Sequence, residues 1–313
     1  MQNTIDNKKQ IAQNNDNNKV AQNDNHDNKE NSAARAKLIT QRVLVYAFMI
    51  ILTFICLFFF YLLFVNASRS HAELQAGFTL IPSTHFFDNF KKLWNYTDVA
   101  NIKLGLWNSF LIASLTAIIT TYFSALCAYG IYAYNFKMKK AAETFILAIM
   151  MIPSQVASVG FVQMCNEFGW KNQFWVLIIP GIAAPATFFY MIQHLRATLP
   201  LELVEASRMD GSSEFMTFNR IVLPVMKPAL AVQLIFSFVA SWNNLYLPTL
   251  LLTEKYKRTL PTMLSLLRSA DLSKMDMGLI YMAIFLSIFP VLIVYVFLSK
   301  SIIKGVTSGS VKG

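Results

Sequence analysis

The stretch ELVEASRMDGSSEFMTFNRIVLP, residues 202–224, is polar, carries charges of both signs and lies between two strongly apolar stretches. Its first half predicts a short helix followed by a tight turn. Pro200 can open the helix with its fixed φ, and good helix formers continue to Met209. Asp210 and Gly211 then supply a turn in which glycine can take a positive φ.

The second half of the stretch predicts another helix. Ser212 or Ser213 can cap its amino end, and Glu214 lies favourably in its first turn. Leu223 with Pro224 is expected to end it. The local pattern is therefore a helix, a turn and a second helix.

The second helix carries one apolar stripe, because Phe215, Phe218 and Val222 recur at spacings of three and four residues. The stripe could be buried in the membrane interface or in a groove on another protein. Helices that lie in the interface usually carry an excess of Lys and Arg. Here acidic and basic residues balance, which favours docking on protein: Glu202, Glu205, Asp210 and Glu214 against Arg196, Arg208, Arg220 and Lys227.

The surrounding composition is that of an integral membrane protein. Of the 313 residues, 55% are hydrophobic and only 14% are charged, and the mean hydropathy is +0.43. A soluble chain of this length is less apolar. The formal net charge of +10 does not predict nucleic-acid binding, because the basic residues lie mostly between apolar runs rather than in one patch.

Six apolar runs reach the length of about 20 helical residues that a bilayer core requires. The predicted fold class is therefore all-α, with six transmembrane helices at about 43–65, 106–134, 142–163, 173–195, 228–252 and 278–301. The predicted domains are a disordered Asn-rich cytoplasmic tail (1–41), a first transmembrane helix with an extracytoplasmic loop (42–105), a core domain (106–303) containing a cytoplasmic loop (196–227), and a cytoplasmic C-terminal tail (304–313).

Positive charge orients these helices. Six crossings put both termini on the same side, and 17 of the 27 Lys and Arg residues lie on that side. The positive-inside rule then predicts that both termini and the loop 196–227 are cytoplasmic. The bias is incomplete, because Thr253–Met277 carries five basic residues on the opposite side.

The chain lacks the residues that several other functions need. No Asp, Glu, Lys or Arg lies in the middle of an apolar run, so no ion relay is evident. A phosphate-cradling GxxxxGK[ST] loop is also missing. The three cysteines and four histidines have no ligand spacing. We therefore expect no catalytic residues, no metal and no cofactor. If the chain moves a solute uphill, the energy must come from another subunit.

The polar stretch resembles the EAA loop of the membrane-spanning subunits of ABC importers. Its flanks, LRATLP before it and MKPAL, SWNNLYLP, TLP and KGVTSGSVKG after it, look like a carbohydrate-importer permease of the maltose type. The resemblance runs from about Asn108 to Gly313. It implies the permease fold of type I ABC importers and a coupling role for Glu205, Ala206, Ser207, Asp210, Gly211, Ile221, Leu223 and Pro224. Ser207 and Ser212 stand where the family most often has Ala.

The resemblance also implies partners and a location. These are a second, homologous permease, two ATP-binding subunits, an extracytoplasmic solute-binding protein, a carbohydrate solute, and the lipid bilayer of a bacterial cell membrane. In the family the turn sits in a cleft on the ATPase and transmits its closure to the membrane helices. Within this class, a permease for glycerol-phosphate or another polyol-type solute is the alternative. A channel or a stand-alone secondary transporter fits the uncharged runs and the cytoplasmic loop less well. A membrane-embedded enzyme is disfavoured because the runs contain no clustered His, Asp or Cys.

Trp242, Asn243 and Asn244 are the candidate substrate path, because an aromatic ring beside two amides suits a neutral sugar. Related permeases usually have WN followed by Asp or Glu, so Asn244 removes a charge. Other polar residues within the runs predict either interhelical hydrogen bonds or solute contact: Asn108, Ser109, Gln155, Gln163, Gln193, Ser237 and Ser241.

Overall fold

The computed structural model describes residues 38–98, 100–269 and 276–310, and all regular structure in these ranges is helical. The chain divides into two compact units between Leu62 and Leu63. Each unit is described by itself.

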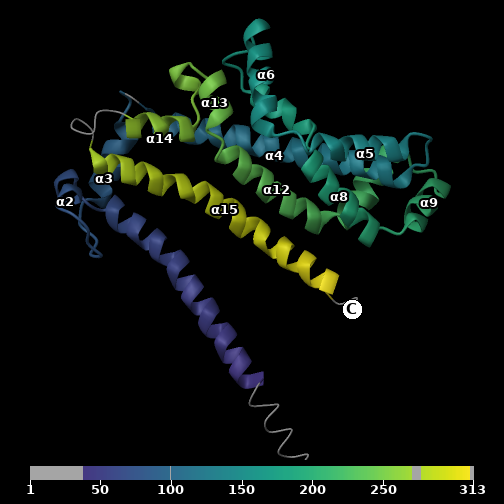
Figure 1. Ribbon diagram of the computed structural model, residues 1–313, viewed down its shortest axis with the longest axis horizontal. Helices are drawn as coiled ribbons and strands as arrows, with labels where there is room; N and C mark the ends of the chain where they lie inside the picture. Colours follow the sequence, from purple (N-terminus) through teal and green to yellow (C-terminus); the bar gives the residue numbers. More distant parts are fainter. Residues whose placement is uncertain (1–37, 99, 270–275, 311–313) are drawn as a thin grey trace, which may run out of the picture. The chain divides into compact units, whose positions relative to one another are not determined.

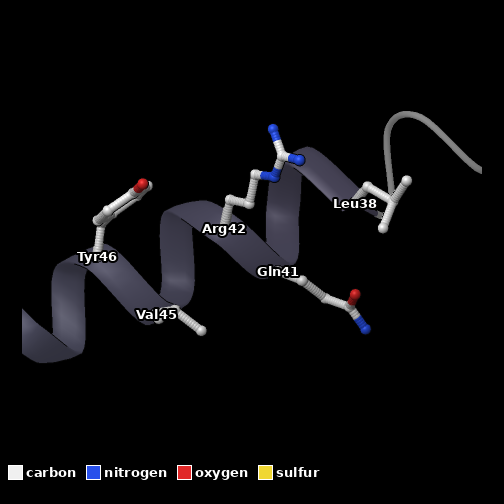
Figure 2. Close-up of a pocket in the computed structure, with 5 residues that line it drawn as sticks. All are labelled: Leu38, Gln41, Arg42, Val45 and Tyr46. Carbon is white, nitrogen blue, oxygen red and sulfur yellow. The ribbon is translucent and has the colours of Figure 1, made fainter. Parts of the chain in front are cut away.

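The first unit consists, in its described part, of one long apolar helix that begins at Leu38 and continues to Ala67 in the second unit. The structure corrects the predicted boundary of the N-terminal tail, because residues 38–41 are already helical. The remainder of the predicted tail, residues 1–37, lies outside the described residues. Figure 2 shows side chains from the first turns of this helix that line a shallow cavity: Leu38, Gln41, Arg42, Val45 and Tyr46. All five come from one helix, so the hollow is a helix surface.

The second unit contains the remaining elements (Figure 1). In chain order they are α2 (His71–Gln75), α3 (Phe86–Asn95), α4 (Ile102–Ala133), α5 (Lys139–Ile149), α6 (Ser154–Glu167), α7 (Trp175–Ile178), η1 (Ile179–Ile182), α8 (Pro185–Thr198), α9 (Leu201–Met209), α10 (Glu214–Thr217), η2 (Phe218–Val222), α11 (Leu223–Val225), α12 (Lys227–Trp242), α13 (Tyr246–Leu251), η3 (Lys255–Lys257), α14 (Leu260–Ser269) and α15 (Met277–Ser310).

The long helix α4 organises this unit by packing against α8 and α12. Small residues on α4 let these neighbours approach closely, since Ala113, Ala117, Ala125 and Ala128 are all buried. The first two belong to a core cluster shared with α12, α14 and α15, and the last two to a cluster shared with α8 and the polar loop. Figure 1 shows α14 and α3 near one end of α4 and α9 near the other.

All six predicted apolar runs are largely helical, but the described residues contain only four helices that are long and apolar enough to cross a membrane. These are Leu38–Ala67, Ile102–Ala133, Trp175–Thr198 and Met277–Ser299. The count reaches six only if each of two bent helix pairs is one span. One pair is α5 with α6, bent by 90°, and the other is Glu214–Val225 with α12, bent by 84°.

Prolines explain where the predicted runs are interrupted. Run 142–163 breaks between α5 and α6 at Pro153, which has no N–H to continue the helix. Run 228–252 ends its main helix at Trp242 and resumes at Tyr246. The ring of Pro248 would clash with the carbonyl of Asn244 in a continuous helix. Apolar composition alone did not predict either break.

The C-terminal boundary also differs from the prediction. Helix α15 continues to Ser310, so residues 304–310 of the predicted tail extend the last helix. Residues 311–313 lie outside the described residues.

Asn89 of α3 joins three segments at the end of the unit opposite α9. Its side-chain Nδ2 donates to the carbonyl oxygens of Ala67 and Arg69 at 2.9 and 2.8 Å. Gly278, in the first turn of α15, packs so closely that an added Cβ would lie 2.9 Å from the Asn89 amide. Asn89 is buried, so its amide satisfies two carbonyls that water does not reach.

We expect Asn89→Ala to lower the free energy of unfolding of the purified protein by roughly 1–3 kcal/mol, because buried carbonyls would lose their donor. Thermal unfolding in detergent would measure the change. Asn95→Ala is the matched control, since Asn95 is exposed on the same helix. Equal midpoints for the two variants would contradict a structural role for the Asn89 amide.

Candidate functional site

The polar stretch forms a compact loop between α8 and α12. Helix α9 begins after Pro200, whose φ is −65°, and ends at Met209 as predicted. Ser213 caps α10, its hydroxyl accepting from the Met216 N–H at 3.3 Å. The helical path then continues through η2 and α11.

The carboxyl end of this path differs from the prediction. Pro224 does not end the helix, because it lies inside α11, which runs to Val225. The bend of 84° into α12 comes immediately afterwards, at Met226. Pro224 is tolerated there because the first positions of a short helical segment do not need its N–H.

Gly211 closes the turn between α9 and α10. Its φ of +76° lies in the left-handed region, as predicted for this glycine. The Gly211 N–H donates to the Arg208 carbonyl, and the Ser212 N–H donates to the Ser207 carbonyl, both at 3.0 Å. This is the Schellman arrangement that ends a helix at a glycine. A Cβ at Gly211 would meet nothing within 4 Å, so the requirement for glycine is one of backbone conformation.

A buried group of hydroxyls holds the two sides of the turn together. Ser207 Oγ donates to the Val204 carbonyl at 2.8 Å and lies 3.1 Å from Thr217 Oγ1. Thr217 Oγ1 in turn donates to Ser212 Oγ at 3.0 Å. Ser207 and Thr217 are both buried. The serine at position 207, which departs from the usual Ala, therefore links α9 to α10.

An ion pair crosses the same turn on its half-exposed side. Arg208 Nε donates to Glu214 Oε1 at 2.7 Å, and Glu214 Oε2 also accepts from the Tyr129 hydroxyl at 3.0 Å. The Arg208 guanidinium lies 5.2 Å from the centre of the Tyr134 ring. The Glu214 carboxylate raises the pKa of Arg208 further above its ordinary value. The pair thus ties the loop to the carboxyl end of α4.

The apolar stripe of the second helix is divided by the structure. Phe218 and Val222 are fully buried inside this chain, while Phe215 is 67% exposed. The Phe218 ring lies 5.6 Å from the rings of both Tyr122 and Tyr129 of α4. The prediction that the whole stripe docks on another protein is therefore wrong for two of its three residues. They pack against the protein's own membrane helices, which the local sequence could not identify.

The most exposed side chains of the loop lie around the turn at Gly211. Met209 is 88% exposed and Phe215 67% exposed, and Glu205, Asp210 and Gly211 are exposed beside them. Two large apolar side chains and two carboxylates thus stand out from a rigid turn. Such a projecting surface can fit into a groove.

The predicted coupling residues separate into exposed and packed positions. The exposed ones are Glu205, Ala206, Asp210, Gly211 and Pro224, and those wholly or partly buried are Ser207, Ile221 and Leu223. Sequence reasoning missed Thr217, the Arg208–Glu214 pair and Tyr129. Glu214 had been noted as a first-turn acid, but nothing in the sequence paired it with a tyrosine 85 residues earlier.

The three candidate solute-path residues do not present a free aromatic face. Trp242 is 3% exposed and its ring stacks on Phe238, with 5.7 Å between centroids and 18° between planes. Asn243 is exposed and Asn244 half-buried beyond the end of α12. The two amides are thus accessible while the indole belongs to the core.

Two of the polar residues in the spans have structural partners. Asn108 Nδ2 donates to the carbonyl oxygens of Tyr256 and Arg258 at 2.9 and 3.0 Å. Ser109 Oγ accepts from the Leu260 N–H at 2.8 Å. For these two, the structure favours contacts within the protein over contact with solute. Among the described residues, no group of three or more His, Cys, Asp or Glu could hold a metal ion.

The sequence matches one protein family, described as binding-protein-dependent transport system inner membrane component, over residues 117–304. Among curated relatives, the arabinooligosaccharides transport system permease protein AraQ of Bacillus subtilis is 32% identical over 275 residues, which cover 87% of this chain and 96% of AraQ. The trehalose/maltose transport system permease protein MalG of Thermococcus litoralis is 28% identical over 279 residues, with 88% and 98% covered.

A solved structure has the same fold. It is a chain of a bacterial ABC transporter involved in the import of the acidic polysaccharide alginate, with a TM-score of 0.71 and 19% sequence identity. The similarity covers 82% of this chain and 95% of that one.

We expect Thr217→Val to loosen the turn, because an isosteric methyl removes the hydroxyl that joins Ser207 to Ser212 in a buried place. Amide hydrogen exchange over residues 205–217 should speed up by a factor that corresponds to roughly 1–3 kcal/mol. Thr198→Val is the control, since the exposed Thr198 hydroxyl bonds only the His194 carbonyl of its own helix. Unchanged exchange in Thr217→Val would refute the role of the hydroxyls.

Proposed function

We propose that this chain, which belongs to the family of binding-protein-dependent transport system inner membrane components, is the permease subunit of an ATP-driven importer for an oligosaccharide. It is a multi-pass membrane protein and a transport permease. The observation that carries the proposal is the loop between α8 and α12, a rigid turn with an exposed apex and a buried back. In this role the loop receives the movement of an ATPase, and the chain itself does no covalent chemistry.

Six crossings with both termini in the cytoplasm form part of the proposal, and contacts at the two ends of α4 support it. At the loop end, the Tyr132 hydroxyl donates to the Leu199 carbonyl at 2.6 Å. Arg196 of α8 pairs with Glu143 of α5 at 2.8 Å. The end of α4, the start of α5 and the end of α8 therefore lie on one face.

The segments that join the helices at their other ends lie together on the opposite face. Lys255 Nζ donates to the Asp98 carbonyl at 2.6 Å, and Asn172 Oδ1 accepts from the Thr253 N–H at 2.7 Å. We propose one crossing each for α4, α5–α6, α7–α8 and α15, and one for the bent pair whose membrane part is α12, with the N-terminal helix as the sixth. The positive-inside bias then assigns the loop face to the cytoplasm.

An oligosaccharide is the proposed solute because relatives of this chain carry the names of oligosaccharide systems, including arabinooligosaccharides and melibiose, raffinose and stachyose. The middles of the six apolar runs contain no charged residue, which favours a neutral solute over glycerol-phosphate. The amides of Asn243 and Asn244 are the proposed contacts on this subunit. Trp242 is proposed to support them from the core.

The proposed assembly contains one copy of this chain, a second homologous permease, two ATPase subunits and an extracytoplasmic solute-binding protein. Gentle extraction followed by mass spectrometry of the bound proteins tests it. Uptake of arabino-oligosaccharides into vesicles that contain the complex should require ATP and stop with vanadate. Uptake by this chain reconstituted alone would overturn the proposal.

We expect Gly211→Val to leave the protein in the membrane and to uncouple ATP hydrolysis from uptake. A β-branched residue at φ +76° is strained by about 1–3 kcal/mol, so the turn should change shape where the ATPase binds. Paired measurements of ATP hydrolysis and solute uptake in vesicles would show the ratio of ATP consumed to solute moved rise several-fold.

Gly211→Asn is the matched control, because asparagine accepts the left-handed conformation more readily than valine. It should retain most of the coupling. If Gly211→Val transports as well as the unmodified protein, the assignment of the turn as the coupling element is wrong.

A further inference from the structure

Helix α4 carries polar contacts at two levels that are separated by about one membrane thickness. Its 32 residues run without interruption from Ile102 to Ala133. Asn108 and Tyr129 are 21 positions apart, so at 1.5 Å per residue they lie roughly 32 Å from each other along the helix. The hydrocarbon core of a bilayer is about 30 Å thick.

At the loop level, two tyrosines of α4 hold the second half of the loop. The Tyr129 hydroxyl donates to Glu214 Oε2 at 3.0 Å, and its ring stacks on Phe218. The Tyr122 hydroxyl donates to Asn219 Oδ1 at 3.3 Å. Any displacement of α10 and η2 must therefore move α4 or break these contacts.

At the other level, α4 holds the backbone of the segment between α13 and α14. Asn108 binds the carbonyls of Tyr256 and Arg258, and Ser109 binds the Leu260 N–H. An added Cβ at Gly105, one turn earlier on α4, would lie 3.3 Å from Leu260 Cα. The segment 256–260 is thus packed directly on the amino end of α4.

The same segment is fastened to the turn before α7 by Asn172. Asn172 Oδ1 accepts from the N–H groups of Thr253 and Glu254 at 2.7 and 3.0 Å, and its carbonyl accepts from Lys257 Nζ at 2.7 Å. Asn172 has a φ of +60°, a conformation that asparagine tolerates better than most residues. Segment 253–260 therefore connects the far end of α4 to the start of the α7–α8 crossing.

The other crossings of this unit are poorly suited to carry movement over this distance. Within the described residues, α5–α6 is bent by 90°, α7 and α8 are separated by η1, and α12 meets its preceding segment at 84°. Helix α15 contains Pro290. Helix α4 has neither a break nor a proline, so it can move as one rod.

We propose that Tyr129 and Asn108 are positioning residues of one transmission element, in which α4 carries the displacement of the coupling loop to the extracytoplasmic segment 253–260. The inference rests on the proposed function. The residue at each end acts through α4 and touches neither nucleotide nor solute. Coupling of this kind is reciprocal, so a partner that holds segment 253–260 also biases the loop.

The test uses the complete transporter in vesicles, with hydrogen exchange followed over residues 201–217 and 253–260 before and after trapping with ATP and vanadate. In the unmodified protein both segments should change on trapping. In Tyr129→Phe the change at 253–260 should fall several-fold, although the loop itself remains protected by the ATPase. Maximal uptake rate should fall while the solute concentration for half-maximal uptake stays the same.

Asn108→Leu tests the other end and should give the same loss at 253–260. Because the two residues act through one helix, the double variant should be no worse than the more severe single variant, so the effects are non-additive. Tyr46→Phe is the matched control, since it removes a tyrosine hydroxyl from the N-terminal helix, where Figure 2 shows the side chain. It should respond as the unmodified protein does.

The outcomes separate this inference from the proposed function. If trapping does not alter residues 201–217 of the unmodified protein, the proposed function fails. If it alters them, but Tyr129→Phe retains the full response at 253–260, the transmission through α4 is wrong while the coupling loop stands. A loss of equal size in Tyr46→Phe would also overturn the inference, because the effect would then be general.

Discussion

The burial of Phe218 between Tyr122 and Tyr129 is the contact on which the polar loop depends. Without it, the middle of the loop would be held against α4 mainly by polar contacts, such as those of the Tyr129 hydroxyl with Glu214 and of the Tyr122 hydroxyl with Asn219. Burying a phenylalanine side chain contributes roughly 1.5–3 kcal/mol, and aromatic pairs add about 0.5–1.5 kcal/mol each. The contact is therefore strong enough to hold the back of the loop against α4 while its apex stays in solvent.

The polar contacts around Phe218 fix the shape of the loop more than they strengthen its attachment to α4. Arg208 and Glu214 are half-exposed, and ion pairs of this kind contribute little to stability. Their value lies in geometry, because both groups belong to the turn and Glu214 also binds Tyr129. The hydroxyls of Ser207 and Thr217 likewise fix the geometry of the loop from its buried side. A loop with a fixed shape can transmit a push, which a flexible one would absorb.

The sequence predicted the local structure of the loop well because the signals there are local. Proline and glycine punctuation identified the start of α9 and the turn at Gly211, and a serine cap identified the start of α10. The same reasoning failed where the partner lies far away in the chain. The burial of Phe218 and Val222 depends on tyrosines about 90 residues earlier. A single sequence does not show which residues so far apart come into contact.

For the fold, too, the sequence predicted the local features but not the bends or the burial of particular side chains. Apolar length located the helical runs, and four helices among the described residues are long and apolar enough to cross a membrane, because the bilayer imposes a minimum length on any spanning helix. It did not predict the bend at Pro153 or the helix break after Trp242, since composition is insensitive to where a helix bends or stops. The burial of Trp242 was also not predicted, because an aromatic residue at the end of a span is equally suited to a core and to a sugar.

Bends and straight segments together explain how one subunit can be both deformable and stiff. The helical path is interrupted before α6, at η1 and before α12. Helix α4 stands between them, packed on α8 and α12 through small residues, and it holds a connection on each face. A displacement of the loop would therefore act on one uninterrupted helix, α4, and on neighbouring helices that are interrupted. Helix α4 would carry the displacement to its amino end, and the interrupted helices would adjust to the new position of α4.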